Sequence, residues 1–138
     1  MAKAASSLEL AVPADRVWRL IGGFGSLPDW VSNLAKSELR EGGRTRHLTT
    51  LDGATIVERL MAFDETGRNY TYHIVEAPLP VTDYYSTLKV VATNSGAGSR
   101  VEWSGEFTPK DLSDEAASKI FQGIYDDGLK ALAAHFAK

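Results

Sequence analysis

Residues 114–136, DEAASKIFQGIYDDGLKALAAHF, form the longest stretch of the chain with one unbroken periodic pattern. Its apolar positions recur three and four residues apart, which predicts one long amphipathic helix that lies on another layer of the protein. Asp114 supplies a hydrogen-bond acceptor at the helix N-terminus, and Glu115 follows where the helix dipole favours negative charge. The predicted buried stripe comprises Ala117, Ile120, Phe121, Ile124, Gly128, Leu132 and His135.

Two glycines, Gly123 and Gly128, lie inside this predicted helix. Each costs about 1 kcal/mol relative to alanine in a helix interior. A helix that only fills a core is expected to carry side chains at such positions. Glycine on or beside the buried face leaves room instead, either for a closely approaching strand or for a ligand. The rest of the chain is then expected to supply the sheet on which the helix lies.

The composition indicates one domain, spanning residues 1–138, that is large enough to bury a core. Its net charge of −3 argues against nucleic acid or an anionic membrane as the main partner. The absence of cysteine excludes disulfides, thiolate metal sites and cysteine nucleophiles. No apolar run has the length of a membrane span, and the first residues lack the apolar region of a signal peptide, so we expect a cytoplasmic protein.

The chain before the long helix changes from short helices to strands near residue 35. Residues 6–12 alternate between polar and apolar and predict a first strand. A short amphipathic helix follows at residues 14–21, and a second short helix is expected to begin near Pro28. Six further strands are predicted at residues 36–41, 44–51, 54–63, 68–76, 81–92 and 99–108. Short turns between consecutive strands predict a seven-stranded antiparallel meander, which curves around the long helix in an α+β fold.

Glu58 is the most informative polar residue, because Ile56 and Leu60 flank it at the spacing of one strand face. If those two side chains face inward, Glu58 faces inward with them. In the alternative arrangement Val57 belongs to the inner face and Glu58 is solvated. The flanking apolar side chains favour the first arrangement. A carboxylate inside a cavity is costly unless it is paired or protonated.

The partner of Glu58 depends on the hairpin at Asp52-Gly53, which is a strong two-residue turn signal. A strict two-residue loop pairs His47 with Glu58, whereas a three-residue loop with a bulge brings Arg46 to that face instead. Either pair is able to orient a polar group of a ligand. An Arg46–Glu58 pair would serve equally well as a structural cross-strand salt bridge.

Aromatic residues recur at strand spacing on the predicted inner face. The residues expected to face inward are Tyr70, Tyr72, Ile74, Tyr84, Leu88, Val90, Val101, Trp103 and Phe107. Aromatic stripes of this kind occur more often in a core than around a ligand, but buried tyrosine hydroxyls need hydrogen-bond partners. A wet or ligand-filled cavity satisfies three such hydroxyls more easily than a dry core.

The sequence offers no motif for a metal or a cofactor. The three histidines, His47, His73 and His135, are scattered without the spacing of metal ligands. No phosphate-binding loop, dinucleotide fingerprint or nucleophile elbow occurs in the chain. We therefore expect neither a metal nor a cofactor.

Several short motifs, taken in their order along the chain, resemble one known superfamily. They are Trp30 to Leu34, Glu58-Arg59-Leu60, Glu76-Ala77-Pro78-Leu79-Pro80, Val101-Glu102-Trp103 and Gly123-Ile124-Tyr125-Asp126-Asp127-Gly128-Leu129. Over nearly its whole length the chain is similar to the SRPBCC superfamily (START/birch-pollen-allergen-like), and most similar to its bacterial polyketide cyclase/dehydratase-type branch. This resemblance implies a helix-grip fold with an apolar cavity between the sheet and the long helix. Binders and enzymes share that fold, so it does not imply one chemistry.

The resemblance also bears on individual residues. It favours Arg46 over His47 as the partner of Glu58. It implies Trp-His-Pro at the short helix, where this chain has Trp30-Val31-Ser32 and therefore lacks the histidine that would supply polarity or acid–base chemistry. The resemblance to plant hormone receptors, whose loops close over the cavity mouth, suggests that Pro78-Leu79-Pro80 is an entrance lid. The alternative is a plain hairpin connection.

Three functions remain open from the sequence. The first is a protein that binds a hydrophobic or amphipathic small molecule. Its expected ligand contacts are Trp30, Arg46, Glu58, Tyr72, Leu79, Tyr84, Trp103, Phe121, Ile124 and Gly128. The second is a polyketide cyclase/dehydratase-like enzyme with Glu58 or a tyrosine as general acid or base. The third is an interaction module with a filled, vestigial cavity. A homodimer through an edge strand or the face with Trp18 is compatible with the sequence, but nothing requires it.

Overall fold

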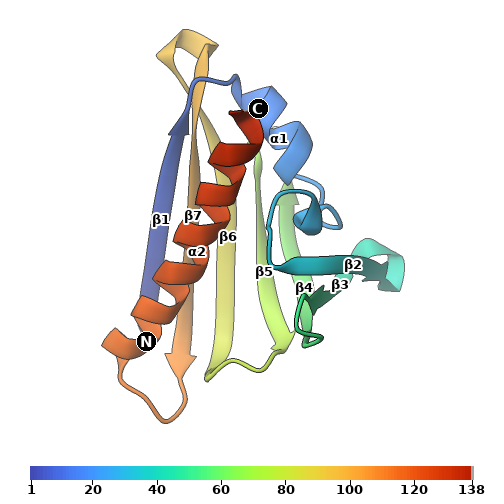
Figure 1. Cartoon of the computed structure of the whole chain (residues 1–138), viewed down its shortest axis with the longest axis vertical. Coiled ribbons are helices and arrows are strands. Elements are labelled where there is room, and N and C mark those ends of the chain that lie inside the picture. The colour runs from blue at the N-terminus through green and yellow to red at the C-terminus, as the bar shows by residue number, and fades with distance from the viewer. Residues whose placement is uncertain (138) are drawn as a thin grey trace.

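The computed structural model describes residues 1–137, which form a curved sheet and a long helix packed on its inner face (Figure 1). The elements in chain order are β1 (Ala2–Leu10), α1 (Ala14–Ile21), η1 (Leu27–Asp29), β2 (Leu34–Arg40), η2 (Glu41–Gly43), β3 (Thr45–Thr50), β4 (Thr55–Asp64), β5 (Asn69–Glu76), β6 (Val81–Thr93), η3 (Asn94–Gly96), β7 (Gly98–Pro109) and α2 (Asp114–Phe136). The three η elements are short 3-10 helices. Within the described residues, no helix is both long enough and apolar enough to cross a membrane.

The seven strands form one antiparallel sheet in the order β1-β7-β6-β5-β4-β3-β2. The predicted meander from β2 to β7 is confirmed, and β1 completes the sheet on the far side of β7. Register shifts interrupt the ladders in β2, β4 and β6. Such bulges bend a strand and increase its twist. As a result β2 and β3 turn nearly crosswise to β5, β6 and β7 in Figure 1.

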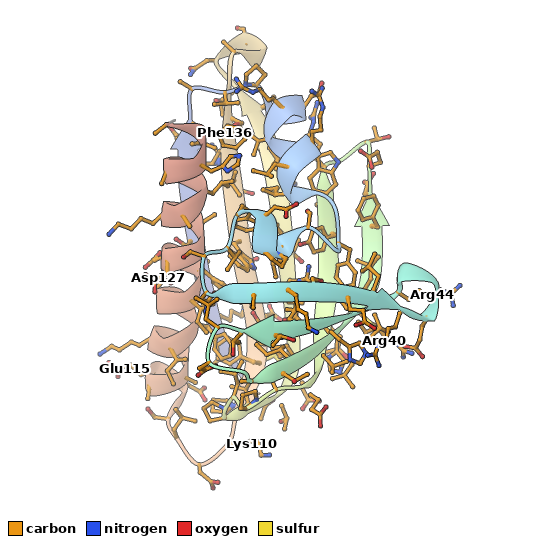
Figure 2. All side chains as sticks on the ribbon, turned by 45° about the vertical axis from the view of Figure 1, so that its right-hand side comes forward. Arg40, Arg44, Lys110, Glu115, Asp127 and Phe136 are labelled. Atoms are coloured by element: carbon orange, nitrogen blue, oxygen red, sulfur yellow. The ribbon has the colours of Figure 1, made fainter. Side chains whose placement is uncertain are left out.

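Helix α2 lies against β1 and β7, and its predicted bounds are confirmed. The residue that caps it is Ser113 rather than the predicted Asp114. The Ser113 hydroxyl accepts a hydrogen bond of 3.1 Å from the backbone N–H of Ala116. Figure 2 shows Glu115 and Asp127 on the side of α2 that faces away from the sheet.

The buried face of α2 differs from the predicted stripe. Its buried residues are Ala117, Phe121, Tyr125, Gly128, Leu129 and Leu132. Ile120 and Ile124 are 39% and 40% exposed, and His135 is exposed as well, so these three assignments were wrong. Hydropathy ranks isoleucine above tyrosine, but a tyrosine is readily buried when its hydroxyl finds a partner, as that of Tyr125 does.

The two glycines of α2 have different surroundings. A Cβ atom at Gly128 would lie 2.6 Å from the Cζ3 atom of Trp103 on β7, so this glycine admits a closely approaching side chain of the sheet. A Cβ atom at Gly123 would meet no other atom within 4 Å. Gly128 therefore has one of the two expected roles, which is to let a strand of the sheet approach the helix closely. The structure gives no steric reason for glycine at position 123.

The structure also differs from the prediction in the bounds of β1. Strand β1 begins at Ala2 rather than at residue 6 and ends before Val12, because small alanines continue the inward face where hydropathy is weak. The second short helix near Pro28 is confirmed as the 3-10 helix η1. Trp18 is buried and its indole N–H donates to the Glu65 carboxylate at 2.8 Å, so it offers no exposed face for a dimer.

The two glycines give a matched pair of substitutions. Gly123→Ala is expected to raise the free energy of unfolding by about 1 kcal/mol, because it improves helix propensity without meeting a neighbour. Gly128→Ala is expected to lower it by about 1–3 kcal/mol, because the new methyl group overlaps the Trp103 ring. Urea denaturation of both variants measures the difference. Stabilisation by both substitutions would show that α2 is not seated on Trp103 as described.

Candidate functional site

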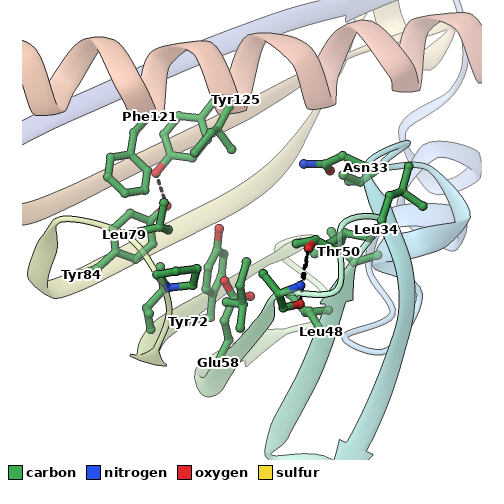
Figure 3. Close-up of a pocket in the computed structure, with 18 of the residues that line it drawn as sticks. Asn33, Leu34, Leu48, Thr50, Glu58, Tyr72, Leu79, Tyr84, Phe121 and Tyr125 are labelled. Atoms are coloured by element: carbon green, nitrogen blue, oxygen red, sulfur yellow. Dashed lines mark hydrogen bonds between the residues drawn. The ribbon is translucent and has the colours of Figure 1, made fainter.

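A pocket of about 410 Å³ lies between α2, the β3–β4 hairpin and the loop before β6 (Figure 3). Apolar side chains make most of its wall: Leu27, Val31, Leu34, Leu48, Leu51, Ala54, Ile56, Ile74, Pro78, Leu79, Trp103, Phe121 and Ile124. Its polar lining residues are Asn33, Thr50, Asp52, Glu58, Tyr72, Tyr84 and Tyr125. A volume of this size and an apolar wall with few polar groups are typical of small-molecule sites in proteins.

The β3–β4 hairpin decides which residue meets Glu58. Thr50 N–H donates to the carbonyl of Ala54 at 2.9 Å, so residues 51–53 form a three-residue loop, and Gly53 occupies its left-handed position with φ of 91°. This loop places Arg46 directly opposite Glu58. Arg46, rather than His47, is therefore the partner, as the resemblance favoured.

Arg46 is completely buried and makes contacts in several directions. Its Nε donates to Glu58 Oε1 at 2.8 Å, and its Nη2 lies 2.7 Å from the same oxygen. Its Nη1 donates to the Phe24 carbonyl at 3.0 Å and to the Tyr70 hydroxyl at 3.3 Å. The guanidinium also lies over the rings of Phe24 and Tyr72, at 4.2 and 4.8 Å from their centroids. These contacts stabilise a cation that has no access to water.

The charge of Arg46 is secure despite its burial. Burial acts to lower the pKa of the guanidinium, but the neighbouring Tyr70 and Glu58 outweigh it, so the pKa of Arg46 lies above its ordinary value. Both contacts with Arg46 use Oε1 of Glu58. Within residues 1–137, the other carboxylate oxygen, Oε2, accepts no hydrogen bond, and Glu58 lines the pocket.

Breaking this pair is expected to be costly. Glu58→Leu leaves the buried Arg46 cation unpaired and is expected to lower the free energy of unfolding by about 3–5 kcal/mol. The double variant Arg46→Met/Glu58→Leu is expected to be more stable than the sum of the two single changes predicts, by at least about 2 kcal/mol, because no charge is then left buried. Urea denaturation of all four proteins gives this coupling free energy. Additive effects would show that the two residues do not act as an ion pair.

A network of hydroxyls lies on the side of the pocket next to α2. Ser86 donates to the Ser104 carbonyl at 2.7 Å, so its own proton is engaged. Tyr125 donates to Ser86 Oγ at 3.4 Å, and the Tyr84 hydroxyl is hydrogen-bonded to that of Tyr125. Because Tyr125 gives its only proton to Ser86, Tyr84 is the donor to Tyr125. The network therefore has one direction, from Tyr84 to the backbone of β7.

Burial is the main cause that raises the pKa of three pocket tyrosines above the ordinary value of about 10. The pKa values of Tyr72 and Tyr84 are raised most strongly, and the Glu58 carboxylate adds to the effect at Tyr72. The pKa of Tyr125 is raised as well, although its bonds with Ser86 and Tyr84 oppose the shift. At neutral pH these three residues are hydrogen-bonding phenols and not phenolate bases.

This shift predicts an alkaline limit to stability. The folded chain holds the three phenol protons more tightly than the unfolded chain, so the contribution is complete below the unfolded pKa of about 10 and is lost as the pH rises above it. Urea denaturation between about pH 9 and 11.5 should show a fall that is shallower in Tyr72→Phe. Equal slopes in both proteins would contradict the assignment to Tyr72. Near-ultraviolet absorbance of tyrosinate checks that the folded protein titrates late.

Seven of the ten predicted ligand contacts line the pocket: Glu58, Tyr72, Leu79, Tyr84, Trp103, Phe121 and Ile124. Arg46 lies behind Glu58 and does not reach the pocket surface. Trp30 packs against Trp103 with ring centroids 5.6 Å apart, and Gly128 lies beneath the same ring, so neither lines this pocket. That the lining residues contact a ligand stays a prediction.

The sequence analysis did not name four polar lining residues as ligand contacts, Asn33, Thr50, Asp52 and Tyr125, nor Ser86 in the hydroxyl network beside the pocket. Tyr125 lies on α2 one turn after Phe121, and its helical spacing was a signal that hydropathy concealed. Ser86 alternates with Tyr84 and Leu88 on β6, so the period of the strand could have placed it on the inner face. Among the described residues, no three His, Asp or Glu side chains lie together as metal ligands would.

A curved antiparallel sheet that holds a long C-terminal helix, with a pocket between them, defines a START-like helix-grip protein. Residues 1–137 match the family described as polyketide cyclase/dehydrase and lipid transport, and the chain belongs to that family. No protein with a curated description matches the chain.

Solved structures show the same fold. The protein XoxI from Bacillus cereus is 51% identical to this chain, covers 100% of it and 97% of its own length, and superposes with a TM-score of 0.96. Zhui aromatase/cyclase from Streptomyces sp. R1128 is 16% identical over 96% of this chain and 88% of its own, with a TM-score of 0.74. A START superfamily protein from Mycobacterium smegmatis is 12% identical over 98% and 97%, with a TM-score of 0.80. The last two likenesses concern the fold alone.

Proposed function

We propose that this protein binds a hydrophobic or amphipathic small molecule, such as a lipid, a polyketide or an aromatic compound, in the pocket between the sheet and α2. The observation that carries the proposal is the division of the pocket surface. Its walls are apolar side chains from α2, β3, β4 and β5, and its buried polar groups are Glu58 and the tyrosine hydroxyls. A ligand that fills such a space gains from burial of its apolar part and uses its polar part for orientation.

A cyclase or dehydratase activity is the second candidate. The observation that favours it is the unshared Oε2 oxygen of Glu58, which faces the same pocket as Tyr72. In such a reaction Glu58 acts as the general base and Tyr72 as a hydrogen-bond donor, because the raised pKa of Tyr72 keeps its hydroxyl protonated. Turnover separates the candidates, since a binder returns its ligand unchanged and an enzyme does not.

The third alternative, a vestigial cavity, has less support. It predicted bulky side chains that abut Gly123 and Gly128 and fill the interior. Trp103 does fill the space beside Gly128, but the pocket of about 410 Å³ lies next to it. A cytoplasmic location and a homodimer stay predictions.

Native mass spectrometry of protein purified from its own host tests the proposal directly. A stoichiometric small molecule released on denaturation is the expected result, and its mass identifies the ligand class. That molecule then serves as the substrate in a turnover assay. A protein that carries no ligand, and that also fails to bind uncharged apolar probes, would overturn the proposal.

Two isoleucines of α2 supply a matched pair for the pocket itself. Ile124 lines the pocket and Ile120 does not, although their exposures of 40% and 39% are nearly equal. Ile124→Glu is expected to weaken binding of the uncharged fluorescent probe N-phenylnaphthylamine at least about tenfold, because it places a charge at the pocket wall. Ile120→Glu is expected to leave the affinity within about twofold. Equal effects of the two substitutions would show that the probe binds elsewhere.

A further inference from the structure

The hydroxyl network leaves one proton unassigned, and that proton belongs to Tyr72. The indole N–H of Trp103 donates at 3.1 Å both to Tyr72 and to Ser86. Trp103 is a donor only, so the Tyr72 hydroxyl is the acceptor in this bond and still has its own proton to give. The Ser86 hydroxyl is also a weak hydrogen-bond partner of Tyr72. Its oxygen, however, already accepts from Trp103 and Tyr125. Within the described residues, no hydrogen bond of normal geometry takes the Tyr72 proton, although the side chain is only 3% exposed.

The neighbouring Glu58 has a hydrogen-bond acceptor without a donor. Its Oε1 is occupied by Arg46, and its Oε2 receives no donor from residues 1–137. Glu58 on β4 pairs with Ile74, and Leu60 pairs with Tyr72, so Glu58 and Tyr72 are diagonal neighbours on adjacent strands. Figure 3 shows both side chains pointing into the pocket. One free donor and one free acceptor therefore lie together at the pocket floor.

The charges around the pocket have a single sign. The ionisable acids of its lining are Glu58 and, at the mouth, Asp52, whose pKa is lowered by hydrogen bonds from the Thr50 hydroxyl and the Ala54 N–H. Among the described residues that line the pocket there is no lysine or arginine. Arg46 is behind Glu58 and is already engaged by it. A carboxylate or phosphate head group would meet negative charge without a compensating cation.

We infer that the pocket selects ligands whose polar end is an uncharged group with both a hydrogen-bond acceptor and a donor, such as a primary amide or a hydroxy-ketone, and discriminates against anionic head groups such as fatty-acid carboxylates. The acceptor of the ligand receives the Tyr72 proton, and its donor bonds to Glu58 Oε2. The apolar remainder lies along the leucine and isoleucine wall. This inference rests on the proposed binding function and adds the chemistry of the ligand head group to it.

Matched ligands that differ only in the head group test the inference. On a naphthalene scaffold, 2-naphthamide is compared with 2-naphthoate, and on an alkyl scaffold decanamide is compared with decanoate, by calorimetric titration of the full chain at neutral pH. At least one amide is expected to bind, and to bind at least about tenfold more tightly than its carboxylate, because the carboxylate replaces a donor with a charge that faces Glu58. Equal affinities, or tighter binding of the carboxylates, would overturn the inference while leaving an apolar binding pocket in place.

Substitutions test which residues cause the preference for an amide head group. Tyr72→Phe removes the free donor and is expected to weaken amide binding roughly fivefold, which corresponds to one neutral hydrogen bond. Tyr85→Phe is the control, because Tyr85 lies on the outer face of the same strand pair and is 44% exposed. Equal weakening by the two variants would refute the role of Tyr72. In Glu58→Gln, where that variant folds, the preference for amide over carboxylate is expected to shrink.

The same measurements separate the inference from the proposed function. N-phenylnaphthylamine is uncharged and largely apolar, so it reports on the pocket without depending on a donor–acceptor head group. Binding of this probe together with failure of both amides would refute the head-group inference alone. Failure of the probe and of all four matched ligands would count against the binding function as well.

Discussion

The buried guanidinium of Arg46 is the constraint on which the arrangement of the site depends. A cation without access to water is tolerated only where several acceptors surround it, and here they come from separated parts of the chain. Glu58 comes from β4, Tyr70 from β5, and the Phe24 carbonyl from the segment between α1 and η1. The Arg46 side chain thereby joins β3, β4 and β5 to the segment that precedes β2. It also holds Glu58 in place with one carboxylate oxygen left for the pocket.

Trp103 on β7 has a comparable role where α2 packs against the sheet. Its ring fills the space that Gly128 leaves on α2 and stacks on Tyr125 at a centroid distance of 4.9 Å. Its indole N–H meanwhile fixes the orientation of the Ser86 and Tyr72 hydroxyls. The residue that determines how closely the helix approaches the sheet is thus the residue that sets the polarity of the pocket floor. The packing of the fold and the chemistry of the site cannot be altered independently at this position.

The sequence was informative where a physical signal was local, and misleading where partners were distant. The long helix was predicted with its bounds, because its periodicity and flanking residues lie within a single stretch. Its buried face was not, because Tyr125 is buried through a contact with Tyr84, which is 41 residues away in the chain. Glu58 was placed on the inner face from its two apolar neighbours, with support from the resemblance to known proteins. Its partner needed the loop length, which the letters Asp52-Gly53 do not determine, and the resemblance to known proteins supplied the preference for Arg46.

The length of that loop has an evolutionary consequence. Because the strand period is two, a slip of β3 by one residue against β4 would turn the opposite face of β3 inward and bring His47 to the position of Arg46. An imidazole, which is smaller and not permanently charged, would then stand behind Glu58 in place of the guanidinium. The register of β3 against β4, which the loop at residues 51–53 helps to determine, thus decides which kind of nitrogen group stands behind Glu58. A change of loop length that shifts this register would therefore alter the electrostatic field of the pocket without any substitution in β3 or β4.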